Sequence, residues 1–91
     1  MAASVGTFLV DDGFFITGRG LVLAGTLDGE VEVGNQLVFA GGTRWRVKGV
    51  NYIRRREQSE LLGLLVDTAI ATHEELRRLA VIGETAEIFA T

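Results

Sequence analysis

The sequence has no cysteine, which excludes disulfide bonds and thiolate metal sites and is typical of cytoplasmic proteins. It has no proline and no low-complexity run, so no linker or domain boundary is marked. No apolar run approaches the roughly 18 residues that cross a bilayer, and the opening segment lacks the basic region of a signal sequence. We therefore expect one cytoplasmic domain over residues 1–91, without a membrane partner.

What the sequence does have is apolar material for a single core. Hydrophobic residues make up 47% of its 91 residues. Short β-branched and aliphatic runs alternate with Gly or Asp-Gly, which is typical of an all-β barrel or sandwich. We expect strands at 5–10, 14–17, 20–27, 30–33, 36–40, 44–50, 61–67 and 84–90.

Two glycine turns organise these expected strands. Asp28-Gly29 is the strongest hairpin signal, because a type I′ turn needs positive φ at both central residues. The segment 30–33 that follows alternates strictly, which predicts that its two valines point inward and its two glutamates outward. Gly41-Gly42 predicts a second tight turn.

One short helix is expected at 73–79. Thr72 and Glu75 form a capping box, with acidic residues in the first turn and arginines in the last, as the helix dipole favours. Leu76 and Leu79 are expected to supply its buried side.

The densest run of glycines does not form a phosphate loop. Gly18 and Gly20 begin a dinucleotide-binding pattern, but Leu23 occupies the position of its third glycine. Gly20 and Gly25 have the spacing of a Walker A loop, but Thr26 replaces the lysine. We therefore expect no nucleotide and no cofactor, and interpret these glycines as places where strands twist, bulge or approach another backbone closely.

One pattern of glycines and aliphatic residues runs through the segment from Ile16 to Leu37. Its residues are Ile16, Gly18, Arg19, Gly20, Val22, Gly25, Gly29, Val31, Val33, Gly34, Asn35 and Leu37. This pattern resembles that of the second, β-barrel domain of translational GTPases such as elongation factor Tu, and the resemblance extends over most of residues 8–82. The resemblance implies a closed six- or seven-stranded Greek-key barrel. In the family this barrel packs on the GTPase domain and contacts tRNA or ribosomal RNA. The chain has no P-loop, so the resemblance does not extend to GTPase activity.

No catalytic or metal site is expected. Ser59, Asp67 and His73 are the residue types of a triad, but no nucleophile elbow surrounds Ser59, and His73 is expected to lie exposed at the first helical position. Asp11 and Asp12 are interpreted as a turn before Gly13.

Arg19 lies between two glycines of the motif. One interpretation is structural, with its guanidinium bonded to strand-end carbonyls or a nearby aspartate. The other is contact with a partner.

The basic segment 44–56 is the best functional candidate in this chain, which has a net charge of −3. It contains no acidic residue, and its alternation predicts Trp45 and Val47 inside and three cations outside, at steps close to the phosphate spacing of nucleic acid. Its candidate binding residues are Arg44, Arg46, Lys48, Tyr52, Arg54, Arg55 and Arg56.

Three interpretations of this segment stay open: a solvated face balanced by Glu30 and Glu32 on an adjacent strand, a surface for an acidic protein partner, or an RNA contact. We expect a non-catalytic interaction module that docks a protein, with RNA contact through 44–56 as the alternative. Exposed strand edges would also permit self-association as a homo-oligomer.

Overall fold

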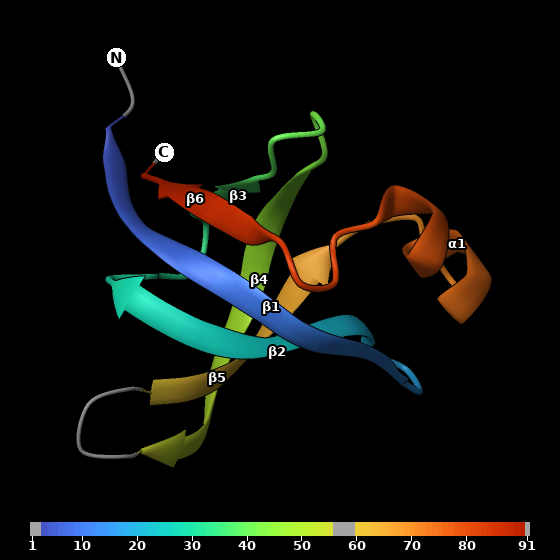
Figure 1. Ribbon diagram of the computed structural model, residues 1–91. Helices are drawn as coiled ribbons and strands as arrows, with labels where there is room; N and C mark the ends of the chain where they lie inside the picture. Colours follow the sequence, from blue (N-terminus) through green and yellow to red (C-terminus); the bar gives the residue numbers. More distant parts are fainter. Residues whose placement is uncertain (1–2, 56–59, 91) are drawn as a thin grey trace.

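The computed structural model describes residues 3–55 and 60–90, and for residues 52–55, 60 and 61 it describes the backbone alone. In this part of the chain it has six strands and one short helix (Figure 1). These are β1 (Ser4–Ile16), β2 (Gly20–Gly29), β3 (Gln36–Val38), β4 (Arg44–Arg55), β5 (Glu60–Asp67), α1 (His73–Leu79) and β6 (Thr85–Phe89).

The strands form a closed antiparallel barrel in the order β1-β2-β5-β4-β3-β6. Strands β3, β4 and β5 pair in sequence, and β6 returns after α1 to lie beside β3, which is the Greek-key arrangement. This confirms the expected all-β barrel with one short helix. Closure gives each described strand two neighbours, but the pairing is partial: β1 pairs with β6 only over Ser4–Leu9, and β4 pairs with β3 only over Arg44–Arg46. Self-association through strand edges therefore stays a prediction.

The inward side chains of the strands fill the barrel. Full burial of one such aliphatic or aromatic side chain stabilises the fold by about 1.5–3 kcal/mol. Trp45 and Phe39 meet edge to face inside, with ring centroids 5.7 Å apart. The core contains Phe8, Val10, Leu21, Leu23, Leu37, Phe39, Trp45, Val47, Leu62, Leu64, Val66, Leu76, Val81, Ala86 and Ile88.

The first strand is longer than expected. The segments 5–10 and 14–17 belong largely to one continuous strand, β1, whose register against β2 shifts between Val10 and Asp12. Asp11 and Asp12 were expected to form a turn, which is wrong. A β-bulge accommodates the extra residue while the strand continues, and both aspartates stay exposed.

The prediction of a hairpin turn at Asp28-Gly29 is also wrong. Both residues continue β2, and Gly29 lies opposite Gly6 of β1. The segment 30–33 is not a strand. Of its two valines expected to point inward, Val31 is half-buried and packs against the core, whereas Val33 is 64% exposed. Pairing with the long β1 keeps both residues in β2, which ends at Gly29, so long-range pairing outweighs the local turn preference.

The expected tight turn at Gly41-Gly42 is present, with the Gly42 N–H donating to the Phe39 carbonyl at 3.0 Å. The turn brings β4 back beside β3.

The helix begins as expected. Thr72 is its N-cap, and the Glu75 backbone N–H donates to Thr72 Oγ1 at 3.2 Å. Leu76 is buried, as predicted, but Leu79 is 40% exposed. The seven-residue helix ends just after Leu79, and Val81 beyond it occupies the next buried position.

Candidate functional site

The outer face of β4 carries three cations, which we call the basic stripe: Arg44, Arg46 and Lys48. All three are exposed, whereas Trp45 and Val47 between them are buried. The two-residue period of a strand produces this division, so the alternation predicted for this segment is confirmed.

The neighbours of the stripe come from β3 and β5. Arg44 lies opposite Val38, and Arg46 lies between Gln36 on β3 and Asp67 on β5. Glu30 and Glu32, expected on an adjacent strand, belong to no strand. No ion pair joins a stripe cation to a carboxylate in the part of the chain that the structure describes. The stripe therefore presents its charge to solvent.

Lys48 departs from the regular spacing of the stripe. The register of β4 against β5 shifts between Val47 and Gly49, so Lys48 is the extra residue of a β-bulge. Only Arg44 and Arg46 therefore keep the regular two-residue spacing along the strand, which is the spacing close to that of phosphates in nucleic acid.

The remaining candidate residues of the basic segment lie further along the chain. Tyr52, Arg54 and Arg55 belong to the C-terminal part of β4, where the backbone alone is described. Arg56 lies outside the described residues. The structure thus brings together the first three of the seven candidates on one surface.

The motif glycines occupy two kinds of position. Gly18 lies in the β1–β2 turn and Gly20 begins β2, whereas Gly29 lies at the end of β2 and Gly34 in the turn after it. Gly25 lies inside β2, where a side-chain carbon would overlap the Leu9 carbonyl oxygen of β1. This close approach of two backbones is the role that the sequence suggested for Gly25.

Arg19 lies exposed in the β1–β2 turn, where its backbone N–H donates to the Ile16 carbonyl at 2.9 Å. Among the described residues, no hydrogen bond or ion pair involves its guanidinium, so the structural interpretation of this side chain is not supported. Arg19 instead borders a pocket of about 310 Å³ whose apolar wall includes Phe15 and Ile70.

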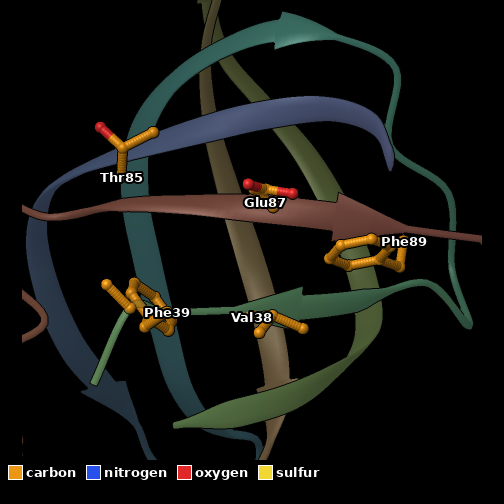
Figure 2. A pocket seen from close by; sticks show the side chains of 6 residues that line it. Val38, Phe39, Thr85, Glu87 and Phe89 are labelled. Carbon is orange, nitrogen blue, oxygen red and sulfur yellow. The ribbon is translucent and has the colours of Figure 1, made fainter. Parts of the chain in front are cut away.

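A second pocket, of about 270 Å³, lies on the outer face of β3 and β6, and we call it the β3–β6 pocket. Figure 2 shows the side chains that line it, with Val38 on β3 and Glu87 and Phe89 on β6. The pocket is lined by Val38, Phe39, Ala40, Thr85, Glu87 and Phe89. No pattern in the sequence marks this pocket, because β3 and β6 are distant in the chain and meet only when the barrel closes.

The residues considered for catalysis do not form a described triad. His73 is exposed at the first position of α1, as predicted, and its ring lies edge-on to Phe15 with centroids 5.2 Å apart. Asp67 is exposed at the end of β5, and Ser59 lies outside the described residues. Within the described ranges, no group of three or more His, Asp or Glu side chains is placed to hold a metal ion.

No family model matches the chain, and no curated protein matches it. Among the described residues, no helix has the length and apolar character needed to span a membrane.

Proposed function

We propose that this chain is a non-catalytic interaction module that docks a protein partner through the basic stripe. One observation carries the proposal: three exposed cations share one face of β4, and none has an ion pair within the described part of the chain. The chain as a whole has a net charge of −3, so this face differs in sign from the average. An acidic surface on another protein is its electrostatic complement.

The surroundings of the stripe favour a protein over RNA. Asp67 lies opposite Arg46, and Glu87 lies opposite Val38, one strand beyond Arg44. A phosphate backbone that runs across the strands carries a charge at every step and meets these carboxylates, whereas a protein can place its acidic groups over the arginines alone. Val38 between them and Phe89 on β6 are half-buried apolar side chains beside these charges, and a protein interface likewise combines non-polar and polar groups.

We also propose that the barrel is of the translation-factor type and that the protein is cytoplasmic. The closed Greek-key barrel is compatible with that resemblance, and the absence of cysteine is typical of the cytoplasm. The resemblance supplies the RNA alternative, which the same experiment tests.

The test is affinity capture from extract of the organism's own cells, with and without nuclease, using the wild-type chain and the double variant Arg44→Glu/Arg46→Glu. The matched control is Arg77→Glu/Arg78→Glu, which changes the net charge equally but on α1. We expect a nuclease-resistant protein partner that the stripe variant loses and the control retains.

Two results would overturn the proposal. One is capture of the same proteins by the wild type and the stripe variant. The other is a partner that nuclease removes, together with salt-sensitive binding of structured RNA that the stripe variant abolishes, because RNA would then be the ligand.

A further inference from the structure

The β3–β6 pocket adjoins the basic stripe. Val38 lies opposite Arg44 of β4 on one side and opposite Glu87 of β6 on the other. Directly opposite residues on antiparallel strands have Cβ atoms about 4.5–5.5 Å apart. A ligand that touches Val38 is therefore within reach of both charged side chains.

A second row of residues crosses the same three strands. Gln36 lies opposite Arg46 on β4 and opposite Phe89 on β6. Two rows of residues therefore cross the outer face. Each row has an arginine on β4, a residue of β3 in the middle and a pocket-lining residue on β6.

The pocket can accept one large apolar side chain. Val38 and Phe89 are half-buried and line it, and Phe39, which is only 4% exposed, also borders it. Its volume of about 270 Å³ exceeds that of a phenylalanine side chain. Binding sites commonly combine such apolar walls with a few charged groups that set the orientation of the ligand.

The charges around the pocket are asymmetric. Both arginines lie on the β4 side, and Glu87 lies on the β6 side. A carboxylate near the apolar group of a ligand is attracted toward β4 and repelled from Glu87. A basic ligand in the same place meets Arg44 and Arg46, with Glu87 on the β6 side, and Asp67 lies further away on β5 beyond Arg46.

We infer that the β3–β6 pocket holds an aromatic side chain of an acidic segment in a partner protein, with carboxylates of that segment lying over Arg44 and Arg46. The inference rests on the proposed function and adds the chemistry of the partner. The apolar pocket selects the anchor, and the stripe selects its acidic neighbours.

The test uses the full chain and three fluorescein-labelled peptides. The first has the sequence Asp-Asp-Phe-Asp-Asp, the second replaces Phe by Ala, and the third replaces every Asp by Lys. In fluorescence anisotropy at low salt, we expect the first peptide to bind about tenfold more tightly than the second, as burial of an aromatic side chain implies. The third should not bind.

Variants locate the peptide on the surface. Val38→Trp fills the pocket and should abolish the preference for Phe over Ala. Val38→Thr keeps the shape of Val38 but adds a hydroxyl group, and it should reduce the preference for Phe by about threefold. This variant tests the pocket if the tryptophan variant unfolds. Arg44→Glu/Arg46→Glu should abolish binding of both acidic peptides, and Glu87→Gln should tighten it by about twofold. Thermal unfolding monitored by circular dichroism checks that each variant is folded.

The outcomes separate this inference from the proposed function. If the Phe and Ala peptides bind equally and both need the arginines, the pocket inference is wrong and the protein-docking proposal stands. The same holds if neither peptide binds while extract proteins are still captured through the stripe. If structured RNA binds through the stripe and no acidic peptide does, both are wrong. A preference for Phe that Val38→Trp removes supports the inference.

Discussion

The β1–β2 pair and the β3–β4 pair form the same barrel in different ways. Strand β1 aligns with β2 at ten register positions, and the two backbones approach so closely at Gly25 that no side-chain carbon fits there. Strand β3 aligns with β4 at three positions, with Trp45 inside and arginines outside. In the long pair, the close contact of the two backbones limits which residue can occupy position 25. In the short pair, only the residues that face the core are limited by packing. The outer face of the short pair is therefore available for binding.

The largest expected effect comes from the inner face of the short pair. Trp45→Ala removes a side chain that is only 7% exposed and its edge contact with Phe39. We expect the free energy of unfolding to fall by about 3–5 kcal/mol. Urea unfolding followed by circular dichroism measures it, since the variant lacks the chain's single tryptophan. A loss below about 1 kcal/mol would show that this pair contributes little to the core.

The next effect concerns the long pair. Gly25→Ala places a methyl group against the Leu9 carbonyl and 2.9 Å from Cζ of Phe8. We expect a loss of about 3 kcal/mol, because the strands must separate to accept it. Gly49→Ala is the control, since its new carbon would make an ordinary contact at 3.5 Å with Leu65. Equal losses in tryptophan-monitored urea unfolding would refute the close-approach argument.

A smaller effect is expected at the β1–β2 turn. Gly20 has a φ of +109° with no atom within 4 Å of an added Cβ, so Gly20→Ala costs backbone strain alone. We expect about 1 kcal/mol. Gly41→Ala also has free space and lacks a positive φ, so its effect on the unfolding midpoint should be near zero. A Gly20→Ala variant as stable as Gly41→Ala would contradict this account.

The smallest stability effect is expected on the outer face of the short pair. Arg44→Ala and Arg46→Ala remove exposed side chains without an ion pair in the described residues, so each should change the free energy of unfolding by less than about 0.5 kcal/mol. Under the proposed function, each still weakens binding of the acidic peptides. A stability loss as large as that of Gly25→Ala would remove the contrast between the two pairs.

The same sequence pattern succeeded in one segment and failed in another. Alternation in 44–48 correctly predicted which residues of β4 are buried, because β3 pairs with Arg44–Arg46 and β5 pairs with β4 from Arg46 onward. Alternation in 30–33 is equally regular, yet this segment is no strand and Val33 is 64% exposed. A two-residue period predicts which residues share a face if the segment is extended. It does not predict whether another strand pairs with that segment.

The candidate surface was predictable only in part. The cations of the stripe could be placed on one face from their spacing, and Thr72 could be placed as a cap from its neighbours. The bulge at Lys48 and the opposition of Arg46 and Asp67 could not, because both depend on the register between β4 and β5. Register depends on packing against the whole barrel.

Local chemistry along the chain was sufficient for the fold class, for the capped helix and for the charged face of β4. These features depend on period, turn residues and capping, which act over a few residues. Long-range pairing placed β6 beside β3, extended β2 as far as Gly29 and brought Val38 and Phe89 into one pocket. These features arise from contacts between residues far apart in the chain, whose energies depend on the whole arrangement of strands.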